Sequence, residues 1–244
     1  MSRIGSRANA VPYQARRAVS PNPLTLLSWK AAYWADDPLW TPPANGAAVS
    51  SWRDGSGNGY TLAQGTGGAQ PTFRSSVTNL NGRAGVEFDG TADFLINATP
   101  VVTQVYTLIA VVDMVGITGT PIISDAGGTG RAALFINAGL TWSAFTGTAA
   151  LSSSYGPSTG LHAFRFKANN ASSVINENMR NTAGTVGNAT GFTGITMGAV
   201  TGGASNWGSF RAGFWGCYQG DITADAAWPD LISALAYLYG VNVA

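Results

Sequence analysis

The chain has 244 residues, of which 45% are hydrophobic and 11% aromatic, so its low charged fraction of 10% does not indicate disorder. A net charge of +1 gives no overall attraction to nucleic acid or membrane, and a single cysteine excludes an internal disulfide framework or a multi-cysteine metal site. All-β sandwiches reach this length as one domain, and 32 glycines suit many turns between short strands.

Residues 1–24 are predicted to form an extended basic arm. They contain four arginines, no acidic residue and three prolines, which oppose a regular helix. Such an arm can order on contact with an acidic groove of another subunit. The residues expected to bind the partner are Arg3, Arg7, Tyr13, Arg16 and Arg17. A tail without a role, or one that contacts nucleic acid, is the alternative.

The beginning of the chain also lacks the apolar stretch of a signal peptide, and no later apolar run reaches the length of a membrane span. We therefore expect a protein that is made in the cytoplasm and not secreted.

Residues 25–244 are predicted to form one domain of short strands. Residues 26–34 fit either a first strand or a short helix. Beyond Val49, turn dipeptides such as Asp54-Gly55 alternate with short candidate strands. In the run at residues 105–113, odd-numbered and even-numbered positions are both mainly apolar, so both faces of a strand here would be apolar. This predicts a central strand between two layers.

The rest of the chain continues this pattern. Further strands are predicted at residues 121–124, 131–137, 140–145, 161–168, 173–176, 192–198 and 209–218. Only the end is helical, since Leu231, Leu235 and Leu238 fall on one stripe, with Pro229 before it and Gly240 after it. The predicted fold is an all-β, antiparallel two-sheet jelly-roll sandwich with an extended N-terminal arm and one short C-terminal helix.

Three segments carry a resemblance to a known family. Residues 49–59 read VSSWRDGSGNG, and they are followed by Gln-Pro-Thr at 70–72 and by Phe-Asp-Gly at 88–90. Together with residues 106–113 and 213–222, these segments resemble the laminin-G-like, concanavalin A-like lectin-glucanase jelly rolls found in phage virion structural proteins and bacterial adhesins. The resemblance covers residues 25–244 and leaves the arm outside.

Groups able to perform catalysis are few. His162, the single histidine, shares strand parity with Phe164 and Phe166, so we expect a structural role rather than a general base. Glycosidases of this fold use clustered carboxylates, whereas Glu87 and Glu177 lie far apart in the sequence. We therefore predict that the chain is not an enzyme and needs no cofactor.

Two other groups of residues are candidates for ligand binding. Asp89 and Asp93 could offer oxygens to calcium, but the alternative, a carboxylate that shapes a tight turn, is favoured. Trp142, Tyr155 and Trp207 lie in or beside loops rich in Gly and Ser, where aromatic rings can stack on glycans; packing in the core or at its rim is the alternative.

The resemblance implies a non-catalytic phage virion structural protein, a decoration or minor head or tail protein. On this interpretation the arm anchors to capsid or tail subunits, and the jelly roll is displayed at the virion surface in many copies, where host-surface glycans are further partners. No nucleic acid and no membrane is expected as a partner. The alternative is a carbohydrate-binding adhesin module that is not part of a virion. A hydrolase is the third and disfavoured class.

Overall fold

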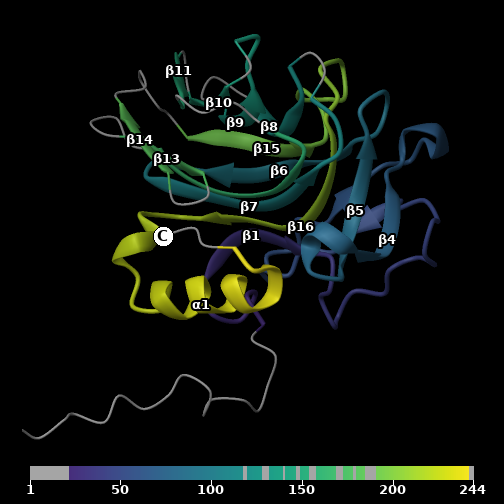
Figure 1. The fold of residues 1–244 in the computed structure, drawn as a ribbon, viewed down its shortest axis with the longest axis horizontal. Helices are drawn as coiled ribbons and strands as arrows, with labels where there is room; N and C mark the ends of the chain where they lie inside the picture. The colour runs from purple at the N-terminus through teal and green to yellow at the C-terminus, as the bar shows by residue number, and fades with distance from the viewer. Residues whose placement is uncertain are drawn as a thin grey trace, which may run out of the picture.

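The computed structural model describes residues 22–117, 120–127, 132–139, 141–146, 149–153, 158–168, 173–177, 180–184 and 191–241. These residues form two antiparallel sheets, one on the other, and a helix near the C-terminus (Figure 1). The predicted all-β two-sheet sandwich with one C-terminal helix is confirmed. Residues 1–21 of the predicted arm lie outside the described residues, whereas its last residues, 22–24, lie within them. No helix of the described residues is long and apolar enough to cross a membrane.

The first sheet, which we name sheet A, has eight strands. They are β1 (Trp29–Trp34), β4 (Thr72–Val77), β5 (Arg83–Asp89), β7 (Tyr106–Met114), β12 (Gly160–Ala168), β13 (Ser173–Glu177), β14 (Arg180–Gly184) and β16 (Ser209–Tyr218). Their order is β14-β13-β12-β7-β16-β5-β4, and β1 pairs with the second half of β16. The first and last strands of the chain therefore meet as neighbours in one sheet.

The second sheet, sheet B, also has eight strands. They are β2 (Ser51–Trp52), β3 (Leu62–Ala63), β6 (Leu95–Val102), β8 (Ile122–Gly127), β9 (Ala132–Ile136), β10 (Trp142–Thr146), β11 (Ala149–Ser152) and β15 (Phe192–Met197). Their order is β11-β10-β9-β8-β15-β6-β3-β2. Strands distant in sequence thus become neighbours, as β15 does between β8 and β6.

The central strand β7 lies between β12 and β16 and is buried along its whole length. Ala110 and Val112 belong to the core between the two sheets. Ile109 and Val111 alternate with them and face the opposite, outer side of sheet A. A strand buried on both faces must be apolar on both parities, which is why residues 105–113 showed no alternation.

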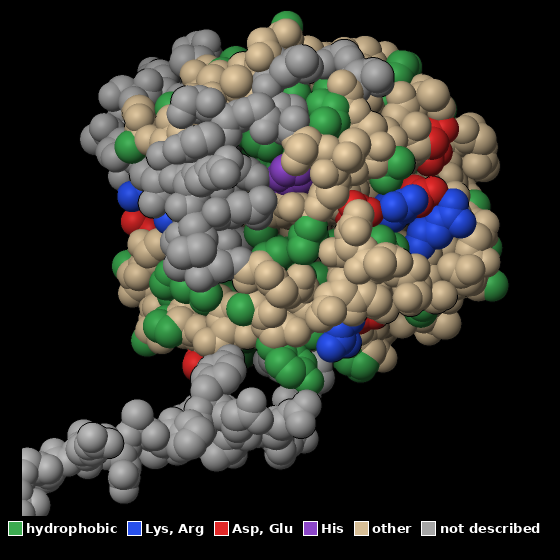
Figure 2. Space-filling view, in the orientation of Figure 1, with side chains coloured by type: hydrophobic (Ala, Val, Ile, Leu, Met, Phe, Trp, Pro, Cys, Tyr) green, Lys and Arg blue, Asp and Glu red, His purple; other side chains and the backbone are tan. Residues whose placement is uncertain are grey.

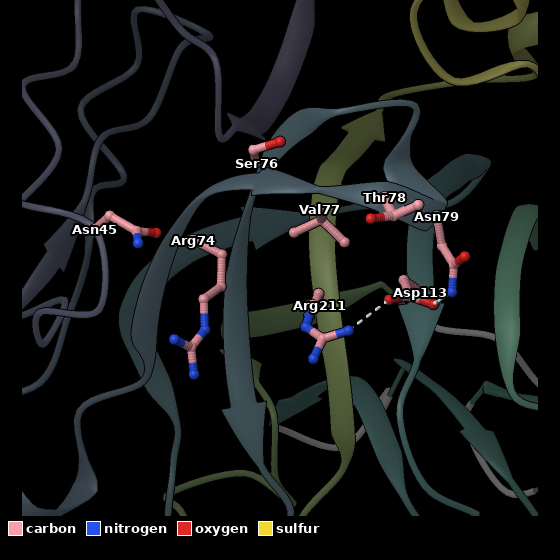
Figure 3. A pocket seen from close by; sticks show the side chains of 8 residues that line it. All are labelled: Asn45, Arg74, Ser76, Val77, Thr78, Asn79, Asp113 and Arg211. Carbon is pink, nitrogen blue, oxygen red and sulfur yellow. Dashed lines mark hydrogen bonds and ion pairs between the residues drawn. The ribbon is translucent and has the colours of Figure 1, made fainter.

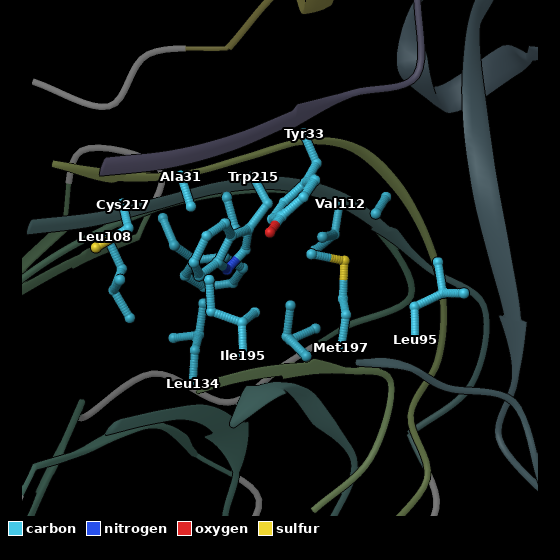
Figure 4. Packing of buried hydrophobic residues seen from close by; sticks show 14 of the residues in the cluster. Ala31, Tyr33, Leu95, Leu108, Val112, Leu134, Ile195, Met197, Trp215 and Cys217 are labelled. Carbon is cyan, nitrogen blue, oxygen red and sulfur yellow. The ribbon is translucent and has the colours of Figure 1, made fainter. Parts of the chain in front are cut away.

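The core between the sheets holds most of the buried aromatic side chains in the described chain. Trp215 is 2% exposed and donates its Nε1–H to Ser124 Oγ of sheet B at 3.1 Å. The ring of Tyr33 lies beside it, with 5.7 Å between ring centroids. Figure 4 shows Trp215, Tyr33 and Cys217 extending from sheet A towards Leu134, Ile195 and Met197 of sheet B. Burial raises the pKa of the Cys217 thiol, so this cysteine packs as a small apolar residue.

Helix α1 (Trp228–Tyr239) lies on the outer side of sheet A, against β1 and β16 (Figure 1). Pro229 stands in its first turn, and Gly240 ends it in the left-handed conformation with φ 72°. The predicted stripe of Leu231, Leu235 and Leu238 is fully buried. Burial of each leucine contributes about 1.5–3 kcal/mol, so packing rather than intrinsic propensity holds the helix.

The first described residues contact the apolar cluster between α1 and the outer side of sheet A. Leu24 is 7% exposed and belongs to the cluster beneath α1. Trp29 donates its Nε1–H to the carbonyl oxygen of Pro23 at 2.9 Å. Residues 26–34, for which the sequence left strand and helix open, contain the strand β1.

Candidate functional site

Charged side chains form a row across three neighbouring strands of sheet A. The register pairs Glu87 of β5 with Arg211 of β16, and Arg211 with Asp113 of β7. Residues directly opposed in antiparallel strands share a face, with their Cβ atoms about 4.5–5.5 Å apart. Glu87 alternates with Val86 and Phe88, which face the core between the sheets. The row therefore lies on the outer face of sheet A.

A bulge in β16 separates this polar row from the apolar surface beneath α1. Ala212 pairs with Val112 and Phe214 with Val111, so Gly213 is an extra residue between the two pairs. A Cβ on Gly213 would lie 2.8 Å from the Tyr239 ring, which explains a residue without a side chain there. Beyond the bulge the outer face is apolar and covered by the helix; before it, the outer face is polar and open.

Ion pairs link the row into a chain of alternating charge, which we name the charge row: Arg74, Glu87, Arg211 and Asp113. Arg74 Nη2 lies 2.6 Å from Glu87 Oε1, and Glu87 Oε2 accepts a hydrogen bond from Arg211 Nε. Arg211 Nη1 lies 2.9 Å from Asp113 Oδ2. Asn79, in the short 3-10 helix η3 (Thr78–Leu80), donates to Asp113 Oδ1 at 2.8 Å. Each carboxylate therefore has two partners, which fixes its orientation.

The ion pairs also set the protonation of these groups. Burial alone would raise the pKa of Glu87, but hydrogen bonds from Arg74 and Arg211 outweigh it and hold its pKa below the ordinary value. The hydrogen bond to Glu87 raises the pKa of Arg74. Burial lowers the pKa of Arg211, yet its bonds to Glu87 and Asp113 outweigh burial and raise it. Glu87 and both arginines are therefore charged at neutral pH.

Arg74, Arg211 and Asp113 of the charge row line an open pocket of about 400 Å³; Glu87 does not line it but is bonded to both arginines. Its lining residues are Asn45, Arg74, Ser76, Val77, Thr78, Asn79, Asp113 and Arg211. Figure 3 shows Arg211 between Arg74 on one side and Asp113 with Asn79 on the other. In Figure 2, basic and acidic side chains are grouped over the part of the surface where β4 and β5 lie in Figure 1. The pocket offers amide, hydroxyl, guanidinium and carboxylate groups to a ligand, with one apolar contact, Val77.

The loop that carries Asn45 is held against the edge strand β4. Asn45 Oδ1 accepts the backbone N–H of Ser75 at 3.0 Å, and the N–H of Gly46 donates to the carbonyl oxygen of Phe73 at 2.8 Å. The loop thus covers part of the open edge of sheet A and forms one wall of the pocket.

The predicted calcium candidates, Asp89 and Asp93, lie at the end of β5. The Asp89 carboxylate accepts the backbone N–H groups of Thr91, Ala92 and Asp93 at 2.8, 3.0 and 3.2 Å. Burial would raise the pKa of Asp89, but these bonds lower it, whereas burial and the Asp89 charge raise the pKa of Asp93 to about 6. No group of three or more His, Cys, Asp or Glu in the described chain is placed to hold a metal ion. This geometry is that of a hydrogen-bonded tight turn.

The glycan-stacking prediction for Trp142 is wrong. Trp142 is fully buried on β10, with its ring 4.2 Å from that of Phe164 and 5.0 Å from that of His162, measured between centroids. The Ser- and Gly-rich neighbours on which the prediction relied belong to strand ends, and the strand itself turns the ring inward. Trp207 is half-buried and its indole nitrogen is enclosed, while Tyr155 lies outside the described residues.

His162 occupies a packing position, as its parity predicted. It is 4% exposed, and its ring is stacked at 5.9 Å on that of Phe164. Its Nε2 lies 2.8 Å from the carbonyl oxygen of Ser158, which provides a backbone partner inside the protein.

Sequence reasoning did not bring the pocket residues together. It named Glu87 as an isolated carboxylate, and it left Arg74, Asn79 and Arg211 without a role. The available signal was a single charged residue within an otherwise apolar strand, as Arg211 is in β16. Such a residue must lie on an open face or have a partner, because burying an unpaired charge is costly.

Comparisons with known proteins identify the fold. No family model matches the chain, and no curated protein matches it in sequence. An arabinofuranosidase complexed with arabinofuranosyl-α-1,2-xylobiose is similar in structure, with TM-score 0.59, 14% identity, 88% of this chain covered and 64% of that chain. The Trypanosoma rangeli sialidase in complex with sialic acid has TM-score 0.57 and 12% identity, and 90% of this chain matches 34% of that chain.

At these identities the similarity shows the fold alone. This chain spans about a third of the sialidase and less than two thirds of the arabinofuranosidase. A second Trypanosoma rangeli sialidase structure, with 2,3-difluorosialic acid, gives the same picture at TM-score 0.58, with 15% identity and coverage of 95% and 35%. The match nevertheless extends over most of this chain.

These findings correct two predictions. The chain was expected to be a non-catalytic phage virion structural protein, and it was expected not to be an enzyme. Both are corrected by the comparisons: the solved structures of the same fold are sialidases and arabinofuranosidases with sugar ligands, which gives no support to a virion role and no ground for excluding an enzyme. The family resemblance misled because one fold carries many functions. The expected capsid, tail and glycan partners stay predictions.

Proposed function

We propose that this chain is a carbohydrate-binding β-sandwich and that its saccharide binds in the pocket beside the charge row. The observation that carries the proposal is the ordered set of hydrogen-bonding groups around Arg211, where two ion pairs hold the guanidinium at the wall of the pocket. The sugar-bound proteins of the same fold support it. The resemblance to laminin-G-like, concanavalin A-like domains is part of the same proposal.

Saccharides are recognised through hydroxyl groups, which both donate and accept hydrogen bonds. The pocket supplies both kinds of partner. Arg211 uses two of its five N–H donors on Glu87 and Asp113, which leaves three for a ligand. The amides of Asn45 and Asn79 and the hydroxyls of Ser76 and Thr78 add donors and acceptors. Because the charged side chains are already held by one another, little side-chain entropy is lost when a ligand binds.

Binding to a glycan array, followed by ligand-observed NMR with each positive glycan, tests the proposal. Ser76→Ala and Asn79→Ala each remove one hydrogen-bonding group from the pocket. Loss of one hydrogen bond, about 1 kcal/mol, should weaken affinity about fivefold. Thr193→Ala, at an exposed position on sheet B, is the matched control and should leave affinity unchanged. Glycan binding that neither pocket variant alters would place the site elsewhere.

A second candidate function is glycoside hydrolysis at the same pocket. The observation that favours it is that Arg211 pairs with two carboxylates, Asp113, which lines the pocket, and Glu87, which lies next to the lining arginines. Most glycosidases act through two carboxyl groups that flank the scissile bond, one of them ionised, and Glu87 fits the ionised partner. A panel of nitrophenyl glycosides would reveal turnover, and Glu87→Gln and Asp113→Asn should each abolish it. Turnover that survives both substitutions would exclude these residues.

A further inference from the structure

The charge row has no net charge. Arg74 and Arg211 each carry one positive charge, and each is paired with a carboxylate at hydrogen-bonding distance. Glu87 and Asp113 supply the two negative charges. The other residues that line the pocket are uncharged: Asn45, Ser76, Val77, Thr78 and Asn79. Glu87 does not itself line the pocket, but it is bonded to both guanidinium groups that do, so its charge offsets theirs. A ligand in this pocket therefore meets strong local dipoles, and the charge row as a whole gives it no net charge.

We propose that the pocket selects uncharged saccharides over acidic ones and that Glu87 sets this selectivity. The inference rests on the proposed function, carbohydrate binding at this pocket, and names the class of ligand. Glu87 bridges the two guanidinium groups and offsets their positive charge, which would otherwise attract a sugar carboxylate.

An acidic saccharide would have to compete with Glu87. Displacing Glu87 from Arg74 and Arg211 would leave a carboxylate whose side chain is 19% exposed without its partners. If Glu87 stays in place, the ligand carboxylate enters beside two others, and like charges repel strongly where water is partly excluded. Either route costs free energy that a neutral sugar does not lose.

A neutral saccharide meets neither cost. Its hydroxyls can accept from the N–H groups that Arg211 leaves free and from the Asn79 and Asn45 amides, and they can donate to hydroxyl or amide oxygens of the lining. None of these contacts requires an ion pair to break. Binding of a neutral sugar should therefore change little with salt, because no net charge is neutralised.

The experiment compares sugars that differ in one carboxylate. Methyl glucoside is paired with methyl glucuronide, and methyl galactoside with methyl galacturonide, each measured by saturation-transfer NMR and calorimetry. Glu87→Gln keeps the shape of the side chain, removes its charge and leaves the charge row with one net positive charge. Asp230→Asn makes the same change of total charge at an exposed position on α1 and is the matched control.

For the wild type and Asp230→Asn, we expect the neutral member of a pair to bind at least about tenfold more tightly than the acidic member. Glu87→Gln should bring the two members within about threefold of each other, mainly by a gain of affinity for the acid. Asp113→Asn removes the other negative charge, so it should act in the same direction and serves if Glu87→Gln fails to fold.

Two results overturn the inference. One is a wild-type protein that binds the acidic member better; the other is a folded charge variant that gains no affinity for acids. If neither wild type nor variants bind any saccharide, the proposed function fails, and the inference fails with it. If Asn79→Ala weakens saccharide binding but the wild type prefers the acidic sugars, the selectivity is refuted and the proposed function still holds.

Discussion

Arg211 and Asp113 face each other from neighbouring strands, with 2.9 Å between Nη1 and Oδ2. The Asp113 side chain is 1% exposed, and because an unpaired buried charge is costly, the charged carboxylate needs its hydrogen-bonding partners. Replacing Asp113 with alanine removes one partner of Arg211 and the acceptor of the Asn79 amide. We expect Asp113→Ala to lower the free energy of unfolding by about 1–3 kcal/mol, measured by urea denaturation. Asp113→Asn, which keeps the shape and an acceptor, should cost less; equal losses would show that the charge of Asp113, not its shape or its acceptor, carries the stabilisation.

Gly198, after β15, has no space for a side chain. Its φ is 92°, and a Cβ there would lie 2.7 Å from the carbonyl oxygen of Asp93 and against the Phe88 ring. Since a backbone oxygen cannot move away cheaply, Gly198→Ala should destabilise the fold by more than about 3 kcal/mol. Gly202 has a similar φ of 81° with open space around it, so Gly202→Ala should cost only about 1 kcal/mol. Thermal melts of both variants separate the two effects, since Gly198→Ala adds steric overlap and Gly202→Ala adds only conformational strain. Equal melting temperatures would contradict the packing around Gly198.

Leu235 anchors α1 on the outer side of sheet A and is fully buried there. Leu235→Ala leaves a cavity beneath the helix and should lower the free energy of unfolding by about 2–5 kcal/mol. Tyr237, on the same helix, is 48% exposed, so Tyr237→Ala should change the free energy of unfolding by no more than about 0.5 kcal/mol. Chemical denaturation of the pair measures what the packed face of α1 contributes. Similar losses for both variants would contradict the assigned helix face.

Asp93 should make stability depend on pH in mildly acidic solution. Its pKa rises from 3.8 to about 6 in the folded protein, through burial and the nearby Asp89 charge. A raised pKa means that the folded state holds the proton more tightly, so this contribution is fully present below pH 4 and is lost as pH rises through 6. The loss is at most about 3 kcal/mol. Asp93→Asn cannot ionise, and its unfolding free energy should therefore not show this decline.

Unfolding of wild type and Asp93→Asn by urea at pH 4, 5, 6 and 7 measures the difference. The free energy of unfolding of Asp93→Asn minus that of the wild type should increase from pH 4 to pH 6. A gap that is constant over this range would show that Asp93 does not titrate there. Asp89, whose pKa is lowered, contributes in the opposite sense below pH 4, outside the measured window.

Sequence patterns predicted the elements whose buried residues follow a regular spacing. β7 is buried on both faces and is apolar on both, and α1 is buried on one face, which carries the leucine stripe. β4 was missed because its buried residues, Phe73 and Val77, are separated by Arg74, Ser75 and Ser76. A register shift between Arg74 and Val77 breaks the alternation by which an edge strand could be recognised.

The pocket could not be predicted from the sequence because strand register creates it. Asn45, Arg74, Asp113 and Arg211 come from separate segments, and only the order β4-β5-β16-β7 places them together. The aromatic residues of Gly-rich stretches gave a stronger but misleading signal, since Trp142 points into the core. Opposed charges on neighbouring strands are visible only once the strand pairing is known.

Cys217 is the single cysteine of the chain and has no exposed surface. It lies on β16, with β1 and β7 on either side, so a thiol reagent reaches it only after these strands have parted. The rate of its modification therefore measures how often the strands around Cys217 separate, rather than how loops fluctuate. The protein thus carries an internal reporter of unfolding that works in native buffer. A second cysteine on the surface could carry a fluorophore while Cys217 stays unlabelled.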